Sequence, residues 1–150
     1  MVKSTKPGEA FDLMRFTPYR LAVAAQVLSE GLARQYRERF DISIPDWRVM
    51  VHLAHSGGAS VRDIEARVAM EKSKVSRAAS RLEDRGLVLK LESTADKRLV
   101  HLSLTPAGRA MMDEILPLAA AFQAKIEALL GADFAGFEAG LDRLLAENHD

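Results

Sequence analysis

The side chains best suited to chemistry lie between Glu71 and Gly86, in the segment EKSKVSRAASRLEDRG. Its small and aliphatic residues recur at a spacing of three and four, which predicts the buried stripe of a helix over about residues 72–85. The other side of this helix carries hydroxyl groups interleaved with ammonium and guanidinium groups, a surface that allows close approach to a polyanion such as nucleic acid. The expected buried stripe is Val75, Ala78, Ala79 and Leu82, and the expected polar face is Lys72, Ser73, Ser76, Arg77, Ser80 and Arg81.

The net charge of the whole chain does not favour nucleic acid as a partner, because phosphate binding is largely electrostatic. The 150 residues contain 21 Lys and Arg against 21 Asp and Glu. These charges are unevenly distributed: residues 60–98 carry 10 basic and 7 acidic side chains, whereas residues 99–150 carry 3 and 8. The neutral total therefore conceals a basic middle segment and an acidic C-terminal end, and only the face that meets phosphate has to be basic.

Length and composition predict one soluble, cytoplasmic domain. Hydrophobic residues make up 48% and charged residues 28% of the chain, as is typical of globular proteins. The absence of cysteine excludes disulfides, thiolate metal ligands, cysteine nucleophiles and thiol redox sensing. We find no apolar run approaching the roughly 18 to 20 residues of a membrane span and no signal-peptide pattern at the N-terminus, so we expect no membrane association.

Two short helices are expected before the basic helix, because the sequence contains two capping boxes. Ser43 with Asp46 predicts the start of the first helix, and Ser60 with Asp63 predicts the start of the second. In each pair the hydroxyl oxygen can accept a hydrogen bond from a backbone N–H in the first helical turn.

A β-hairpin is expected after the basic helix. The basic helix is expected to end in a Schellman motif, with Gly86 in the left-handed position and Leu87 folded back on Leu82. Beyond Gly86 the apolar period changes to two, which predicts strands over 87–92 and 99–104 with a polar tip between them. Two short helices, a basic-faced helix and a hairpin form a winged helix-turn-helix. In that arrangement a helix enters the DNA major groove, and the hairpin tip reaches the adjacent backbone or minor groove.

Longer helices are expected on both sides of this lobe, which covers about 43–105. Apolar periodicity predicts helices over 17–40, 106–130 and 133–148. They are richer in apolar residues than the lobe needs for cover, so we expect them to pack against a second copy of the chain. The predicted fold class is mainly α with a small β-hairpin: one domain, with a winged helix-turn-helix lobe and N- and C-terminal dimerisation helices. The dimer contacts expected first are Leu21, Leu28, Phe134, Phe137, Leu141 and Leu144.

The sequence resembles the MarR (multiple antibiotic resistance regulator) family of transcription factors over residues 60–111. Three features carry the resemblance: KSKVSR leading into RLEDRGLV, the D-x-R pattern at Asp96 and Arg98, and LTPAG at 104–108. The family's order of elements matches the chain from about Thr17 to Asn148. The resemblance implies a regulator that binds double-stranded DNA as a homodimer. Two-fold symmetry then implies a pseudo-palindromic operator, with recognition helices about one DNA turn (roughly 34 Å) apart.

By position, the resemblance implies DNA contacts from both the basic helix and the hairpin tip. Arg98 would enter the minor groove, where a narrow A·T-rich segment has an enhanced negative potential. Asp96 would hold that arginine in place, and Lys97 would contact the backbone. Each contact has a structural alternative. Asp96 and Arg98 could form a local ion pair that only stiffens the hairpin, and the basic helix face could simply be solvated. Arg85, at the end of the helix, could only interact favourably with the helix dipole. The implied DNA contacts are Lys72, Ser73, Lys74, Ser76, Arg77, Arg81, Asp96, Lys97 and Arg98.

Family members often leave DNA when a small aromatic or phenolic acid binds between the dimer helices and the DNA-binding lobe, so the resemblance also implies an effector pocket. An aromatic wall with one or two arginines could hold a ring that bears a carboxylate. The alternative is that Trp47 is a core residue and that Arg20 and Arg48 are structural ion-pair partners. The expected pocket residues are Phe16, Tyr19, Arg20, Trp47, Arg48 and Val51.

A metal site or an enzyme is not expected. His52 and His55 are three residues apart on one predicted helix, but no thiolate is present and the remaining histidines, His101 and His149, are scattered. The chain contains no G-x-S-x-G, P-loop or G-x-G-x-x-G motif. We therefore predict a ligand-responsive DNA-binding regulator, a repressor without metal or cofactor. The alternative is a winged-helix module that binds other proteins and not DNA.

Overall fold

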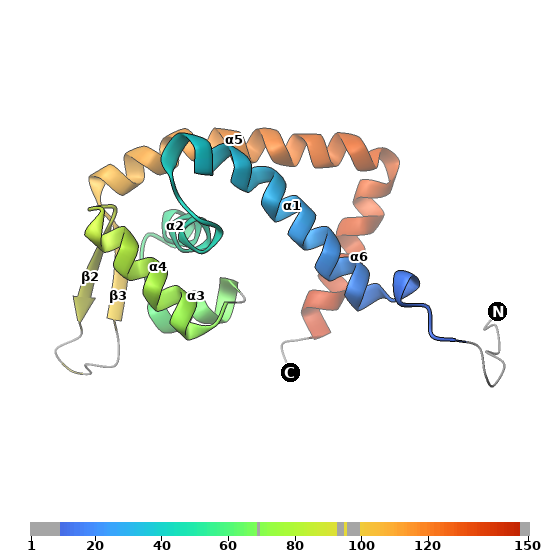
Figure 1. The fold of residues 1–150 in the computed structure, drawn as a ribbon, viewed down its shortest axis with the longest axis horizontal. Coiled ribbons are helices and arrows are strands. Elements are labelled where there is room, and N and C mark those ends of the chain that lie inside the picture. The colour runs from blue at the N-terminus through green and yellow to red at the C-terminus, as the bar shows by residue number, and fades with distance from the viewer. Residues whose placement is uncertain (1–9, 69, 93–94, 96–99, 148–150) are drawn as a thin grey trace.

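The winged helix-turn-helix lobe lies at one end of the molecule and the longer helices extend from it (Figure 1). The computed structural model describes residues 10–68, 70–92, 95 and 100–147. Helices form most of this part, together with one small sheet, so the predicted fold class is confirmed. The helices are α1 (Thr17–Phe40), α2 (Ile44–Ser56), α3 (Val61–Val68), α4 (Lys72–Asp84), α5 (Pro106–Leu130) and α6 (Phe134–Ala146), with short 3-10 turns η1 (Leu13–Arg15) and η2 (Gly131–Asp133). The strands are β1 (Ala59–Ser60), β2 (Val88–Glu92) and β3 (Val100–Leu104).

The sheet has one strand more than the sequence predicts. Its order is β1-β3-β2, with both pairs antiparallel, and Leu102 of β3 lies opposite Ala59 on one side and Lys90 on the other. The two-residue strand β1 is too short to show an alternating pattern, which is why periodicity does not reveal it. It joins the segment between α2 and α3 to the hairpin and so makes the lobe a single unit.

Local sequence signals set the ends of the lobe helices. The Ser43 hydroxyl accepts the Asp46 N–H at 3.2 Å, and the Asp46 carboxylate accepts the Ser43 N–H at 3.0 Å, as the capping box requires. Helix α4 ends in a Schellman motif, in which Gly86 has a φ of 72° and the Leu87 N–H donates to the Leu82 carbonyl at 2.9 Å. Both predicted signals are confirmed.

The buried stripe of α4 is the centre of the lobe core. All four predicted residues of this stripe have 0% exposure, and they belong to one cluster with Leu53, Ile64 and Leu102. Burial contributes roughly 1.5 to 3 kcal/mol for each of the valine and leucine side chains, and this packing holds the polar face of α4 toward solvent. The members of the stripe are Val75, Ala78, Ala79 and Leu82.

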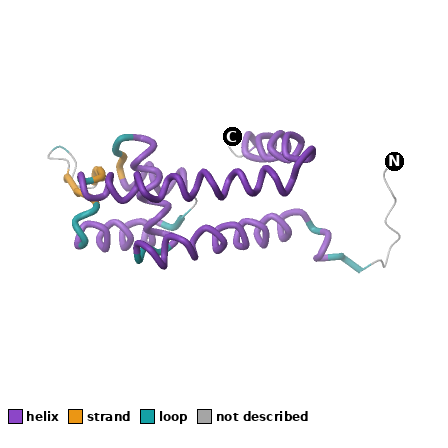
Figure 2. The backbone as a smooth tube through the Cα atoms, turned by 90° about the horizontal axis from the view of Figure 1, so that it is seen from above, coloured by secondary structure: helices purple, strands orange, loops and turns teal. Residues whose placement is uncertain are grey.

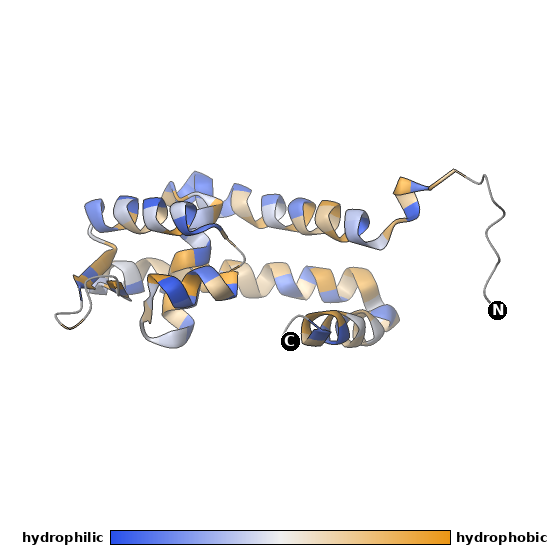
Figure 3. Ribbon diagram, turned by 90° about the horizontal axis from the view of Figure 1, so that it is seen from below, coloured by the Kyte–Doolittle hydropathy of each residue, from blue (hydrophilic) through white to orange (hydrophobic). Residues whose placement is uncertain are grey.

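The longer helices carry apolar surface that this chain does not cover. Helices α1 and α5 extend from the lobe, and α6 folds back from the far end of α5 (Figures 1 and 2). No residue of α6 is buried, and hydrophobic segments are visible along α5 and α6 away from the sheet (Figure 3). Of the exposed large hydrophobic residues, all but Leu89 and Leu91 lie on the N-terminal segment, α1, α5 or α6.

One apolar stretch corrects an expectation from the sequence. By length and composition alone, Pro106–Ala146 could cross a membrane, and only 6% of its most apolar 18-residue window is buried. The expectation that no apolar run approaches membrane length was therefore wrong. Core helices of soluble proteins satisfy the same criterion, so this stretch is weak evidence for a membrane span. It shows how much apolar surface α5 and α6 present outside the fold of one chain.

Candidate functional site

The basic face of α4 is presented to solvent as the sequence predicts. Lys72, Ser73, Lys74, Ser80 and the two arginines are exposed, and Ser76 is half-buried. The ion pairs formed among the described residues do not include Lys72, Lys74 or Arg77. Three cationic groups therefore remain available for an anionic partner on one helix face.

The two arginines of this face have different surroundings. The Arg77 guanidinium reaches back to its own helix, where Nε donates to the Ser73 carbonyl at 3.3 Å. The Arg81 guanidinium instead donates to the Asp46 carboxylate of α2 at 2.9 Å, and the side chain of this aspartate is 8% exposed. Arg77 is therefore available to a ligand, whereas Arg81 already has a buried acidic partner.

Two shallow hollows flank α4 on this face. One, of about 440 Å³, runs along the helix from Ser76 to Asp84; the other, of about 240 Å³, lies between α4 and Pro45 at the start of α2. Arg77 and Arg81 line both of them. The N-terminus of α2 therefore lies beside the basic face, next to the side chains that would meet a phosphate backbone.

Two basic residues near α4 have roles that the sequence does not reveal. Lys90 of β2 donates to the Ser80 hydroxyl at 3.0 Å, which adds a cation to the edge of the basic face. The Arg85 guanidinium does not lie at the carbonyl end of its own helix, because it donates hydrogen bonds to the carbonyls at the end of α1. Both are contacts between distant segments, and no local spacing signals them.

The expected hairpin-tip contacts Asp96, Lys97 and Arg98 lie outside the described residues. Strands β2 and β3 on either side of them are described and pair in the register Val88↔Leu104 to Glu92↔Val100. The hairpin that would carry the tip is therefore present beside α4, and the role of the tip remains a prediction.

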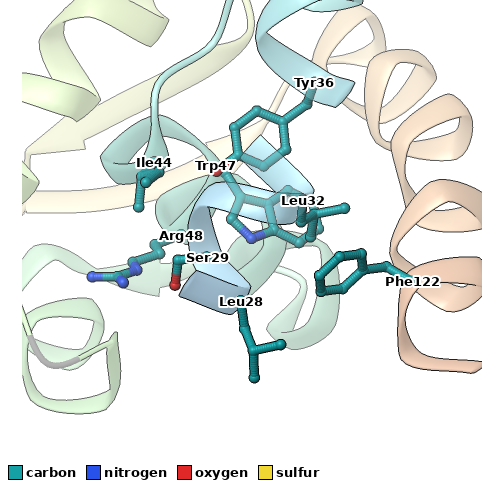
Figure 4. A pocket seen from close by; sticks show the side chains of 8 residues that line it. All are labelled: Leu28, Ser29, Leu32, Tyr36, Ile44, Trp47, Arg48 and Phe122. Atoms are coloured by element: carbon teal, nitrogen blue, oxygen red, sulfur yellow. The ribbon is translucent and has the colours of Figure 1, made fainter. Parts of the chain in front are cut away.

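The expected effector residues are divided between two hollows of the chain. Trp47 and Arg48 line one of about 200 Å³ between α1, α2 and α5 (Figure 4). Tyr19 and Arg20 line another of about 280 Å³ at the start of α1. Phe16 instead packs edge-on against Phe11, with ring centroids 5.0 Å apart, and Val51 lies against the lobe core. One protomer therefore does not bring the six residues into one pocket, because α1 carries its first turn away from α2.

The hollow beside α2 has the aromatic wall that an aromatic ligand needs. Tyr36 stacks on Trp47 with ring centroids 5.5 Å apart, and Phe122 of α5 lies across from them (Figure 4). Burial raises the pKa of Tyr36 to about 12, so its hydroxyl stays protonated at physiological pH. Arg48 lies at one edge with its guanidinium pointing away from the indole (Figure 4). The lining residues that sequence analysis did not assign to the pocket are Leu28, Ser29, Leu32, Tyr36, Ile44 and Phe122.

Comparison with known proteins finds similarity to one family of regulators. Residues 40–99 match the model of the MarR family. The solved structure of a MarR family transcriptional regulator from Silicibacter pomeroyi DSS corresponds to 99% of this chain and 99% of its own, with a TM-score of 0.78 and 27% identity. The chain is therefore similar to MarR-family regulators, by sequence in its winged helix-turn-helix lobe and by fold over nearly its whole length. The MarR family consists of transcriptional regulators and not enzymes.

Curated relatives match part of this chain. The HTH-type transcriptional regulator FarR of Neisseria gonorrhoeae is 30% identical over 89 residues, which are 57% of this chain and 61% of FarR. The homoprotocatechuate degradative operon repressor of Escherichia coli is 30% identical over 74 residues, 49% of this chain and 50% of that protein. The chain thus spans less than two thirds of the length of these relatives.

The expected dimer contacts of this chain lie on surface that the protomer leaves open. Phe137 is 39% exposed, Leu144 is 51% exposed and Leu28 is 37% exposed, and the remaining three are half-buried. Those three are Leu21, Phe134 and Leu141.

The histidine pair of α2 does not have the surroundings of a metal site. His52 is buried, His55 is exposed, and the described residues contain no group of three His, Cys, Asp or Glu side chains that could hold a metal ion. In the described part of the chain, the Nε2 atom of His52 is buried without a hydrogen-bond partner. Burial, followed by the nearby positive charge of Arg67, holds the pKa of His52 below its usual 6.5.

We expect the buried His52 to make folding stability depend on pH. The depressed pKa means that the unfolded chain takes up a proton before the folded chain does as the pH falls through about 6.5. The stability is fully present above pH 6.5 and is lost as the pH falls toward the lower pKa of the folded state. Urea unfolding at pH 7.5 and 5.5 should show this loss in the wild type and less of it in His52→Leu. If the loss of stability between pH 7.5 and 5.5 were as large in His52→Leu as in the wild type, and smaller in His55→Leu, the pH dependence would not come from His52.

Proposed function

We propose that this chain is a homodimeric, sequence-specific DNA-binding repressor that acts in the cytoplasm and that a small aromatic acid releases from DNA. The observation that carries the proposal is the exposed basic face of α4, where Lys72, Lys74 and Arg77 form no ion pair with a described residue. A helix with such a face fits the major groove, and its cations neutralise phosphates. The wing residues Asp96, Lys97 and Arg98 extend the proposed interface to the adjacent minor groove.

The homodimer is supported by the uncovered apolar residues of α1, α5 and α6. In a two-fold dimer the same patch faces itself, so each apolar side chain contributes twice to the buried surface. The dimer also supplies the second recognition helix, which a pseudo-palindromic operator requires. DNA binding and dimerisation therefore use opposite ends of the protomer.

We expect Leu144→Arg to convert the dimer into a monomer. Leu144 is 51% exposed in the protomer, so the change costs the isolated fold little. In the dimer it would place two unpaired charges in apolar contacts, at a cost of several kcal/mol for each ion. Size-exclusion chromatography with light scattering should give half the wild-type mass. Arg143→Ala, the neighbouring exposed residue, is the control and should remain dimeric. A dimeric Leu144→Arg protein with wild-type affinity between subunits would exclude this contact.

The effector is proposed to bind in the hollow between α1, α2 and α5. Its wall of Tyr36, Trp47 and Phe122 offers stacking surface, and Arg48 at its edge can pair with a carboxylate. A relative of this chain is named for an operon of homoprotocatechuate degradation, and homoprotocatechuate is an aromatic acid. The chemistry of the hollow and this name point to the same ligand class.

We expect a hydroxylated phenylacetate or benzoate to raise the melting temperature of the protein. A ligand that binds only the folded state at 100 times its Kd adds about 2.7 kcal/mol of stability. Arg48→Ala should abolish the shift, whereas Arg20→Ala, in the other hollow, should retain it. The acid that gives the shift should also lower the affinity for duplex DNA. A shift that persists in Arg48→Ala and disappears in Arg20→Ala would place the ligand in the hollow at the start of α1.

The alternative of a protein-binding module has one observation in its favour. Leu89 and Leu91 are exposed at 48% and 55% on the same side of β2. Two leucines form a small patch, however, and they do not account for the cations of α4. DNA binding explains more of the exposed surface and is the function proposed.

A further inference from the structure

Two arginines one helical turn apart, Arg81 of α4 and Arg85 directly after its last residue, are bonded to the junction between α1 and α2. The Arg81 Nη2 donates to the Asp46 Oδ1 at 2.9 Å. The Arg85 Nη1 donates to the Asp41 carbonyl at 2.7 Å, and its Nη2 donates to the Phe40 carbonyl at 2.9 Å. These contacts span 35 to 45 residues of sequence and all fall within Phe40 to Asp46.

The acceptor groups at this junction are specially suited to arginine. Asp41, the residue that caps the C-terminus of α1, is in the left-handed region with a φ of 52°, and the last carbonyls of α1 lie at the negative end of the helix dipole. The Asp46 carboxylate is almost fully buried and uses its second oxygen to cap α2 through the Ser43 N–H. One guanidinium therefore holds the end of α1, and the other holds the start of α2.

The position of this junction means that the arginine contacts affect how α4 is oriented relative to α1. Helix α1 ends at Phe40 and α2 begins at Ile44, so only three residues separate the proposed dimerisation helix from the lobe. The end of α4 is also tied to the start of α5, because the Thr105 hydroxyl donates to the Gly86 carbonyl at 2.6 Å. A tilt of α4 relative to α1 would act first on the Arg85 bonds, since no other hydrogen bond among the described residues joins the end of α4 to α1.

We propose that Arg81 and Arg85 form a clamp that fixes the orientation of the recognition helix relative to α1, and that they are positioning residues and not DNA contacts. In a dimer built on α1, this orientation sets the distance between the two recognition helices. The clamp thereby selects the half-site spacing of the operator. This inference rests on the proposed function, because half-site spacing matters only for a dimer on DNA. For Arg81 the proposal is an alternative to the DNA contact that the sequence predicts.

The distance between the recognition helices tests the clamp without DNA. The chain has no cysteine, so Lys72→Cys gives one spin-label site in each protomer. Pulsed electron paramagnetic resonance on the labelled dimer should give a narrow distance distribution. We expect Arg85→Gln and Arg81→Gln to broaden it at least about twofold. Arg85→Lys, which keeps the charge but not the two-carbonyl geometry, should broaden it less. Arg77→Gln is the matched control and should leave the width unchanged.

Salt dependence of duplex binding separates positioning from phosphate contact. Each phosphate contact contributes about 0.9 to the slope of log K against log salt concentration. On one 30-base-pair duplex, Arg77→Gln should lower this slope by about one. Arg81→Gln and Arg85→Gln should lower the affinity about tenfold and leave the slope unchanged. A slope reduced by one in Arg81→Gln would make that residue a DNA contact and overturn its part in the clamp.

The clamp and the proposed function can fail separately. A distance distribution that stays narrow in both Gln variants, in proteins that melt cooperatively, overturns the clamp and leaves the DNA-binding proposal intact. A wild-type protein without a dipolar signal is a monomer and contradicts the proposed dimer. The clamp is then judged by labels at Glu38→Cys of α1 and Lys72→Cys of α4, whose distance distribution the Arg85→Gln change should broaden. An unchanged distribution in that protein would also overturn the clamp.

Discussion

Replacing Arg77 with alanine should weaken binding to an operator duplex by about 1 to 3 kcal/mol, or roughly five- to 150-fold. Arg77 is the exposed arginine of the basic face whose guanidinium has no carboxylate partner among the described residues, and it lines both hollows beside α4. If it reads a guanine edge, the loss should be confined to the specific site. If it neutralises a phosphate, the affinity for all sequences should fall, together with the salt slope.

Fluorescence anisotropy with an operator duplex and a scrambled duplex, each across a salt series, distinguishes these outcomes. Arg143→Ala is the control, because this exposed arginine lies on α6 at the other end of the molecule. Wild-type affinity of Arg77→Ala for both duplexes at every salt concentration would remove α4 from the interface. A loss of equal size in Arg143→Ala would show that net charge, and not position, governs binding.

Replacing Gly108 with alanine should destabilise the fold strongly, although the change adds only one methyl group. Gly108 lies in the LTPAG segment at the first turn of α5, and its N–H donates to the Thr105 hydroxyl at 3.1 Å. A Cβ at this position would overlap the Leu87 carbonyl oxygen, which already accepts the Thr105 N–H. Because the obstructing atom is backbone, a side-chain rotation cannot relieve the clash, and we expect a loss of about 1 to 3 kcal/mol or more.

Thermal unfolding measures this effect. For a chain of this size the loss corresponds to a fall of roughly 3 to 10 °C in Tm. Gly136→Ala in α6 is the matched control, since no atom beyond its chain neighbours and its own helix backbone lies within 4 Å of its Cβ position, and alanine favours a helix by up to about 1 kcal/mol. Its Tm should be equal to or above that of the wild type. A Gly108→Ala protein as stable as Gly136→Ala would show that α5 can move away from the turn after α4.

The features that the sequence predicts well are those decided within a few residues. The capping box at Ser43, the Schellman ending at Gly86 and the four-residue stripe of α4 all depend on contacts within one helix turn or two. Such signals are hydrogen bonds and packing contacts between residues that are close in the sequence, so the sequence alone shows which groups will meet. The placement of the basic face on α4 follows directly, because the buried stripe determines which side remains exposed.

The features that the sequence does not predict depend on distant segments. Arg81 and Arg85 look like further cations of a basic helix, and only the position of α1 and α2 shows that both are bonded there. The effector hollow is similar: Tyr36 and Phe122 come from different helices, and their meeting with Trp47 depends on how α1 and α5 cross α2. Strand β1 forms because the edge of β3 pairs with it, and its two residues are too few to show an alternating apolar pattern in the sequence.

Footprinting of the wild-type protein on a duplex selected from a random pool tests the central claim most directly. A dimer with one α4 in each of two major grooves should protect two half-sites centred about 10 base pairs apart, related by approximate two-fold symmetry. Addition of the aromatic acid that raises the melting temperature should remove this protection. Failure to select any duplex at 100 mM salt, or protection of a single undivided site without symmetry, would contradict a two-fold DNA-binding dimer.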